Sequence, residues 1–189
     1  MTCIVGLVDK GNVYIGGDSA GVSGLGVSIR ADEKVFHNGP FIMGFTSSFR
    51  MGQLLRYKFG PSKQLANQDD MSYMVTDFID SVRKCFGDNG FGSTPDKADN
   101  EGGVFLVGYN GALYHIDSDF QVGKPLWQYD SVGCGSEIAK GSMFSSKGKT
   151  PEARIKLALE ASSAFSGGVA PPFAFVKQMN KKPRRKVTK

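Results

Sequence analysis

Short apolar segments separated by polar turns fill the first quarter of the chain. Residues 2–8 and 13–20 are rich in β-branched side chains and flank an Asp-Lys-Gly-Asn turn, which is the pattern of a β-hairpin. Residues 34–36 and 41–48 predict a second hairpin across His-Asn-Gly-Pro, because Asn-Gly is a strong hairpin-turn signal. The glycine-rich segment 21–26 is expected to link the two hairpins.

A helical period replaces this alternation from residue 48 onward. Residues 48–59 and 71–86 place apolar side chains three and four positions apart, which predicts two helices that each bury one face. Residues 87–103 are rich in Gly, Asp and Asn and predict a loop. The buried face expected for the second helix comprises Met71, Met74, Val75, Phe78, Ile79, Val82 and Phe86.

The second half of the chain repeats the order of strands followed by helices. Residues 104–117 alternate around Asn-Gly and predict a third hairpin, residues 136–144 predict a short helix, and residues 171–178 predict a last strand. Residues 150–165 predict a longer helix with Thr150 as its N-cap and proline at its first position. Clustered strands and clustered helices favour an α+β fold, in which helices pack on antiparallel sheets.

Composition indicates one folded domain and a basic end. The chain has 189 residues, of which 40% are hydrophobic, so it can bury a substantial core, and we expect one domain over residues 1–178. Residues 179–189 form a basic tail with six Lys and Arg residues, without which the formal charge of +5 becomes −1. Such a tail is typical of a solvated chain end or of a contact with nucleic acid or an acidic partner, and both interpretations stay open.

Cysteine and histidine usage argues against disulfides and metal. Cys3, Cys85 and Cys134 are widely spaced, and His37 and His115 lie in no metal-binding motif, so we expect no disulfide framework, no metal and no cofactor. No segment has the apolar length of a membrane span, and the start of the chain lacks the pattern of a secretion signal. We therefore expect a cytoplasmic protein without a membrane contact.

The turn of the first hairpin sets which residues face one another. If Val8 lies opposite Val13, Cys3 faces Asp18. Because paired strands lie about 4.8 Å apart, Thr2 then comes close to Asp18.

The second hairpin places a lysine beside a glycine in the same way. If Phe36 lies opposite Phe41, Lys34 faces Met43 and lies next to Gly44. Pairing alone leaves open whether the two hairpins meet.

If the two hairpins meet, Thr2, Asp18, Lys34 and the Gly44 N–H share one site. Methionine before a small residue is commonly removed, and a terminal threonine then carries both a nucleophile and a base, because an α-amine has a reference pKa of about 7.7–8.0. A Lys34 ammonium would lower the pKa of that amine and of the hydroxyl, and Asp18 would hold the ammonium in place. The Gly44 N–H would bind the oxyanion of a tetrahedral intermediate, a contribution of about 3 kcal/mol.

These residues resemble the active site of proteasome β-type subunits and of the bacterial HslV-type peptidase, which belong to the N-terminal-nucleophile (Ntn) hydrolase superfamily. Those proteins begin with threonine and carry an acid sixteen positions on and a lysine thirty-two positions on, as Thr2, Asp18 and Lys34 do here. The segment Ile-Met-Gly-Phe resembles the family's oxyanion strand, which places the donor at Gly44. The segment Ser-Val-Gly-Cys-Gly-Ser resembles the one that carries a serine near the nucleophile, and here that position is Cys134.

Later segments extend the resemblance to about residue 178. The segment Ala-Phe-Ser-Gly-Gly resembles the family's Ser-Gly-Gly, so Ser166 matches its serine. Ser163 stands where proteasome subunits carry an aspartate, and Cys134 stands where they carry a serine that hydrogen-bonds the terminal amine. The family positions that line the S1 pocket, which receives the substrate side chain before the cleaved bond, correspond to Gly21, Asp32 and Ile42.

The resemblance implies a four-layer αββα sandwich, in which helices flank two antiparallel sheets, assembled into a homo-oligomeric ring. It implies a threonine endopeptidase that cleaves unfolded polypeptides or peptides through an acyl-enzyme on Thr2 after removal of Met1. An ATPase unfoldase is a further partner that the resemblance implies.

A catalytically silent scaffold subunit and a small-molecule amidase of the same superfamily are the alternative interpretations. A scaffold has no reason to keep Thr2, Asp18 and Lys34 at these spacings, which favours an enzyme. An α-type proteasome subunit carries a further helix before its first strand, whereas the strand expected here starts at residue 2, which favours a β-type subunit.

Overall fold

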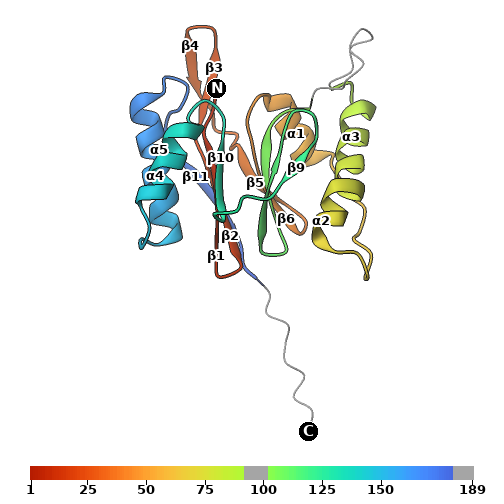
Figure 1. The fold of residues 1–189 in the computed structure, drawn as a ribbon. Helices are drawn as coiled ribbons and strands as arrows, with labels where there is room; N and C mark the ends of the chain where they lie inside the picture. Colours follow the sequence, from red (N-terminus) through yellow and green to blue (C-terminus); the bar gives the residue numbers. More distant parts are fainter. Residues whose placement is uncertain (92–101, 181–189) are drawn as a thin grey trace.

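The elements follow the predicted order of strands and helices in a computed structural model that describes residues 1–91 and 102–180 (Figure 1). The first half contains β1 (Ile4–Asp9), β2 (Asn12–Gly17), β3 (Ala20–Ser23), β4 (Gly26–Ile29), β5 (Val35–Asn38), β6 (Phe41–Phe45), α1 (Phe49–Tyr57), α2 (Asp70–Tyr73), the π-helical turn η1 (Met74–Phe78) and α3 (Ile79–Asp88). The second half contains β7 (Phe105–Tyr109), β8 (Ala112–Ile116), β9 (Val122–Gly123), β10 (Tyr129–Val132), α4 (Ser136–Ser145), α5 (Pro151–Phe165) and β11 (Ala174–Gln178). Most of the loop expected over 87–103 and nearly all of the basic tail lie outside the described residues.

Two antiparallel sheets form the centre of the molecule. The first has the strand order β10-β1-β2-β11 and the second β5-β6-β7-β8-β9, while β3 and β4 form a separate hairpin. β1 and β2 pair with Val8 opposite Val13, so the register predicted for the first hairpin is confirmed. The predicted N-cap of α5 is confirmed as well, because Thr150 Oγ1 accepts a hydrogen bond from the Ala153 N–H.

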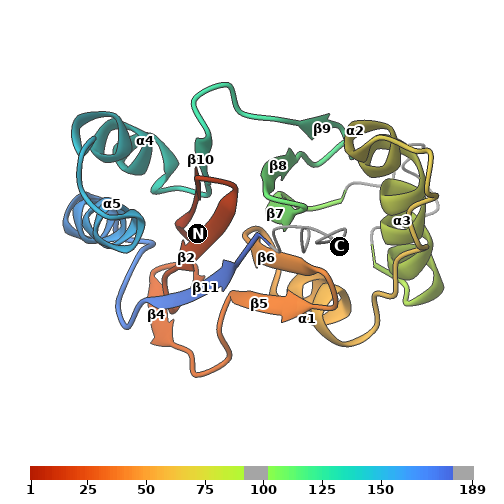
Figure 2. The same ribbon diagram turned by 90° about the horizontal axis from the view of Figure 1, so that it is seen from below.

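Helices cover the outer faces of both sheets (Figures 1 and 2). α4 and α5 lie beside the first sheet, and α1, α2 and α3 lie on the far side of the second. The predicted combination of helices with antiparallel sheets is therefore confirmed. Three clusters of buried apolar residues occur: one includes Val5, Ile155 and Leu159, one includes Ile4, Ile15, Ile42 and Leu106, and the largest includes Phe41, Leu54, Phe78 and Phe105.

No helix among the described residues is both long enough and apolar enough to cross a bilayer.

The register of the second hairpin differs from the predicted one by two residues. β5 and β6 place Phe36 opposite Met43 rather than opposite Phe41, because the turn before Phe41 contains only two residues. Lys34 consequently faces Phe45, whose N–H donates to Lys34 O at 3.1 Å. A shift of two residues leaves every side chain on its expected face.

The glycine-rich segment 21–26 was predicted to be a simple link between the hairpins. It is instead part of a hairpin of its own. β3 and β4 pair with Val22 opposite Val27. The sequence also gave no indication of β10, which pairs with β1 and places Ile4 opposite Val132. β3, β4 and β10 each contain only four residues, and strands this short carry a weak alternation signal.

The helix predicted over 71–86 contains a π-helical turn. α2, η1 and α3 follow one another without a break, and the wider turn changes the period at which side chains return to one face. Met74, Phe78 and Val82 are buried as expected, whereas Met71 and Val75 are exposed.

We expect Gly52→Ala in α1 to destabilise the protein, although alanine favours helices over glycine. A Cβ at Gly52 would lie 2.2 Å from the buried Phe45 ring, and overpacking of this kind costs about 1–3 kcal/mol. The matched control is Gly141→Ala in α4, where a Cβ has no neighbour within 4 Å and should stabilise by about 1 kcal/mol. Urea unfolding of both variants measures the difference, and a stabilised Gly52→Ala protein would contradict the packing of α1 on β6.

A hydrogen bond joins the second sheet to the edge strand of the first. His115 Nδ1 in β8 lies 2.7 Å from Asp130 Oδ2 in β10, and Lys140 Nζ lies 3.3 Å from Asp130 Oδ1. Burial alone would raise the pKa of the Asp130 carboxyl, but the hydrogen bonds from His115 and from the Ser131 N–H, with the charge of Lys140, outweigh it and lower the pKa.

We expect Asp130→Asn to flatten the acid limb of the stability profile. Because the pKa of Asp130 is lower in the folded state, its stabilising contribution is present above the unfolded pKa and is lost as the pH falls through the folded pKa. The free energy of unfolding of the unmodified protein should therefore decline more steeply than that of the variant between about pH 5 and pH 2. Parallel curves over this range would show that Asp130 contributes nothing to acid sensitivity.

Candidate active site

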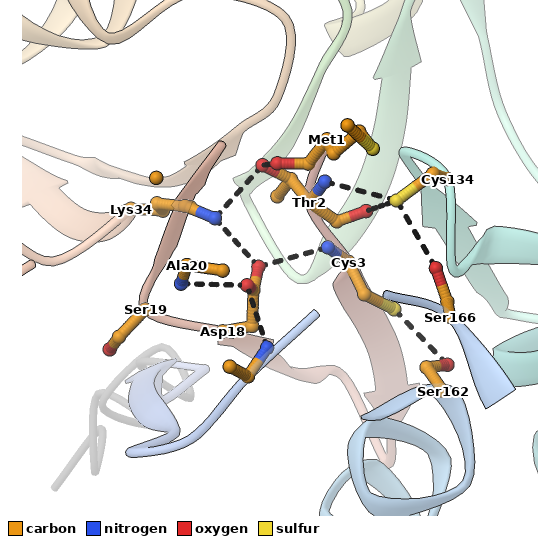
Figure 3. Close-up of polar contacts among 12 residues, drawn as sticks. Met1, Thr2, Cys3, Asp18, Ser19, Ala20, Lys34, Cys134, Ser162 and Ser166 are labelled. Atoms are coloured by element: carbon orange, nitrogen blue, oxygen red, sulfur yellow. Dashed lines mark hydrogen bonds and ion pairs between the residues drawn. The ribbon is translucent and has the colours of Figure 1, made fainter. Parts of the chain in front are cut away.

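Thr2, Asp18 and Lys34 meet beside the start of β1 (Figure 3). Lys34 Nζ lies 2.9 Å from Thr2 Oγ1 and 2.8 Å from Asp18 Oδ1. Thr2 is 4% exposed, and Asp18 and Lys34 are each 1% exposed. The two N-terminal hairpins therefore do meet, which strand pairing alone had left open.

The ends of three strands position these side chains. Thr2 precedes β1 and Asp18 follows β2, so the confirmed hairpin register holds the two close together. The Asp18 N–H donates to Cys3 O at 3.3 Å, and the Cys3 N–H donates to Asp18 Oδ1 at 2.9 Å. Lys34 precedes β5 in the other sheet, and its side chain reaches across to the first sheet.

The Asp18 carboxylate is fully occupied by donors. Oδ1 accepts from the Cys3 N–H and from Lys34, and Oδ2 accepts from the Ala20 N–H at 2.9 Å and the Ala170 N–H at 3.3 Å. These four hydrogen bonds hold the Asp18 side chain in one position, and through Oδ1 it orients Lys34 toward Thr2.

Burial changes the acidity of Lys34. Removal of water from the ammonium lowers the pKa of Lys34, and the hydrogen bond and charge of Asp18 oppose this effect without cancelling it. An ammonium with a lowered pKa is a better proton donor than an exposed lysine. Because it lies 2.9 Å from Thr2 Oγ1, it can stabilise negative charge on that oxygen.

The loop between β10 and α4 brings Cys134 to the nitrogen of Thr2. Cys134 Sγ lies 3.3 Å from Thr2 N and 3.5 Å from Thr2 O, and Ser166 Oγ lies 3.4 Å from the same sulfur. Gly133 has a φ of 98°, and a Cβ there would lie 2.2 Å from Thr2 O, so glycine permits this close approach. The structure thus places Cys134 in contact with Thr2, and Ser166 in contact with Cys134.

Neither a family model nor a curated protein matches the sequence, but solved structures match nearly all of it. BPH from Thiobacillus denitrificans, solved in complex with epoxomicin, superposes with a TM-score of 0.76 at 16% identity, over 96% of this chain and 100% of that chain. HslV from Trypanosoma brucei gives a TM-score of 0.65 at 14% identity, over 93% of this chain and 98% of that chain. The chain has the proteasome β-subunit and HslV-type fold. Anbu, an ancestral β-subunit from Yersinia bercovieri, shares it with a TM-score of 0.64 at 16% identity, over 93% of this chain and 81% of that chain.

The proteasome-type fold of this chain does not direct the Gly44 N–H at Thr2. Hydrogen-bond directions alternate along a central antiparallel strand. The Phe45 N–H donates toward β5, to Lys34 O, and the Thr46 N–H donates to Val104 O on the β7 side. The N–H of Gly44, which lies opposite Leu106, therefore points to β7 as well, so the prediction that it binds an oxyanion gains no support.

The three residues predicted to line the S1 pocket do not lie together: Gly21 and Asp32 lie at or beside a cleft, and Ile42 lies in the core. Gly21 lines an open cleft of about 450 Å³ whose walls include Arg30 and Phe49. Asp32 holds Arg30 through two hydrogen bonds of 2.8 and 2.6 Å, and the guanidinium lies 4.0 Å from the centroid of the Phe49 ring. Ile42 does not reach this cleft: it is fully buried with Ile4 and Leu106, because its side chain lies on the core face of β6.

Supporting residues that the sequence did not reveal surround Cys3. Ser131 Oγ donates to Ile4 O at 2.7 Å, and Ser162 Oγ donates to Gly135 O at 2.9 Å and accepts from Cys3 Sγ at 3.5 Å. The buried hydroxyl of α5 is thus Ser162, one residue before the position that resembles the family's aspartate. The helical period could have revealed it, because Ser162 shares the buried face of α5.

Within residues 1–91 and 102–180, no group of three or more His, Cys, Asp or Glu side chains is arranged to hold a metal ion.

Proposed function

We propose that this chain is a threonine endopeptidase whose nucleophile is Thr2 after removal of Met1. The observation that supports this best is the position of the buried Lys34 Nζ, between Thr2 Oγ1 and Asp18 Oδ1 at 2.9 and 2.8 Å. A buried lysine paired with one carboxylate can be purely structural, but a lysine that also contacts a threonine hydroxyl beside the chain terminus has a chemical use.

Removal of Met1 would turn the Thr2 nitrogen from an amide into an amine that accepts the hydroxyl proton. Oγ1 then attacks the substrate carbonyl carbon, and the tetrahedral intermediate collapses as the α-ammonium protonates the leaving amine. The resulting ester on Thr2 is cleaved by a water that gives its proton to the same amine. Lys34 stabilises the charge on Oγ1 during the attack, and Asp18 holds Lys34 in place; no step is assigned to Gly44.

We infer that the arrangement of helices, sheet, sheet and helices is the four-layer sandwich of Ntn hydrolases. The three separate apolar clusters support this inference, because four layers need three buried spaces between them. We propose a homo-oligomeric ring as the assembled form, unfolded polypeptide as the substrate, an ATPase unfoldase as a partner, and the cytoplasm as the compartment. The cleft beside Gly21, Arg30 and Phe49 would receive a substrate side chain.

The intact mass of the purified protein, before and after treatment with epoxomicin, tests the proposal. The solved complex of BPH with epoxomicin makes this compound the probe of choice. We expect the mass of the chain without Met1, and one covalent adduct that disappears in Thr2→Ala. Retention of Met1 with no adduct would contradict the proposal and favour the silent scaffold.

A further inference from the structure

The sulfur of Cys134 is in hydrogen-bond contact with the nitrogen of Thr2 (Figure 3). Sγ lies 3.3 Å from Thr2 N, and the Thr2 N–H donates to it. Ser166 Oγ donates to the same sulfur at 3.4 Å. Cys134 is exposed, so small solutes can reach this sulfur.

The other two cysteines have different surroundings. Cys3 is buried, and its sulfur lies 3.7 Å from Ser131 Oγ. In Figure 3 this sulfur points to Ser162 rather than toward Cys134. Burial raises the pKa of the Cys3 thiol, and burial also raises the pKa of the Cys85 thiol. Both are therefore poor thiolates and slow to oxidise.

We propose that Cys134 is an oxidation site for hydroperoxides, and that its oxidised sulfur closes onto the nitrogen of Thr2 as a sulfenamide. Sulfenic acids condense with a nearby nitrogen when no thiol is within reach. Here the nitrogen is already in contact with the sulfur, and the buried Cys3 thiol contacts Ser131 and Ser162 instead. Only the effect of this bond on catalysis rests on the proposed function; the bond itself does not.

The chemistry balances with one hydroperoxide. The Cys134 sulfur attacks the terminal peroxide oxygen, the O–O bond breaks, and the products are the sulfenic acid and an alcohol, or water from hydrogen peroxide. The lone pair of Thr2 N then attacks the sulfur, an S–N bond forms, and the S–O bond breaks. The leaving hydroxide takes the nitrogen proton and departs as water.

A small thiol reverses the modification in two steps. The thiol attacks the Cys134 sulfur, the S–N bond breaks, and the nitrogen takes the thiol proton. A second thiol displaces Cys134 from the resulting mixed disulfide and leaves with the first as a disulfide. While the S–N bond exists, the α-amine cannot act as the base for Thr2, so the site is reversibly inactive.

Intact-mass analysis of a Cys3→Ser/Cys85→Ser background tests the proposal without interference from disulfides. After hydrogen peroxide at low excess, we expect a loss of about 2 Da, which corresponds to two hydrogens and is reversed by dithiothreitol. Fragmentation should locate a bond between Thr2 and Cys134. The matched variant Cys3→Ser/Cys85→Ser/Cys134→Ser should keep its mass, and Cys3→Ala can replace Cys3→Ser if the latter does not fold.

Each possible outcome either supports or overturns the proposed sulfenamide. A gain of one or more oxygens at Cys134 without the mass loss would overturn the proposal, as would a mass loss that persists in the Cys134→Ser variant. In a chain that retains Met1, the same bond can form on the Thr2 amide nitrogen. The mass loss in a protein without peptidase activity would therefore support the sulfenamide while the proposed function fails. An active peptidase that never loses the two hydrogens would support the proposed function and overturn the sulfenamide.

Discussion

Thr2→Ala should abolish peptide hydrolysis and leave the fold unchanged. The substitution removes the oxygen that attacks the substrate carbonyl in the proposed mechanism, and loss of a nucleophile lowers kcat by at least about 10⁴-fold. Lys34 keeps its contact with Asp18 at 2.8 Å, so no buried charge is left without a partner. Turnover of a fluorogenic peptide, with circular dichroism to check the fold, measures the effect.

Thr2→Ser is the matched control for this experiment. It keeps a hydroxyl in reach of Lys34 but lacks the methyl group that restricts χ1, so we expect reduced but measurable activity and an epoxomicin adduct. Turnover by Thr2→Ala above that of a mock purification would show that the nucleophile is a different residue.

Lys34→Met should reduce kcat by about 10²–10⁴-fold, the range typical of a residue that assists proton transfer and charge stabilisation. The substitution also leaves Asp18 as a buried carboxylate without its counter-ion. Breaking a buried pair in this way costs about 3–5 kcal/mol of stability, although Asp18 keeps its three backbone donors, from Cys3, Ala20 and Ala170. Urea unfolding and peptide turnover should therefore both change.

A double variant separates the two effects. Lys34→Met with Asp18→Asn removes both charges, so part of the lost stability should return, although the NH2 group of the asparagine faces a backbone N–H donor. Activity should not return. Recovery of activity together with stability would mean that Lys34 acts only through the fold. Near-normal activity in Lys34→Met alone would exclude it from the mechanism.

Local sequence patterns determined much of the fold and one half of the site. The Asp-Lys-Gly-Asn turn and the alternation on either side of it set the register of β1 and β2, so Thr2 had to lie beside Asp18. The period of α5 and the Thr150 cap determined that helix in the same way. These features were predictable because a turn and its flanking residues decide strand pairing and helix ends over short distances along the chain.

Tertiary structure decided the other half of the site. β1 and β5 belong to different sheets, so the contact of Lys34 with Thr2 depends on how the two sheets pack, and no local pattern contains that information. The direction of the Gly44 N–H depends on its neighbour β7, and the burial of Ile42 depends on the first sheet. The sequence determined which residues could form the site; packing between the sheets determined which of them face one another, because that contact joins segments far apart in the chain.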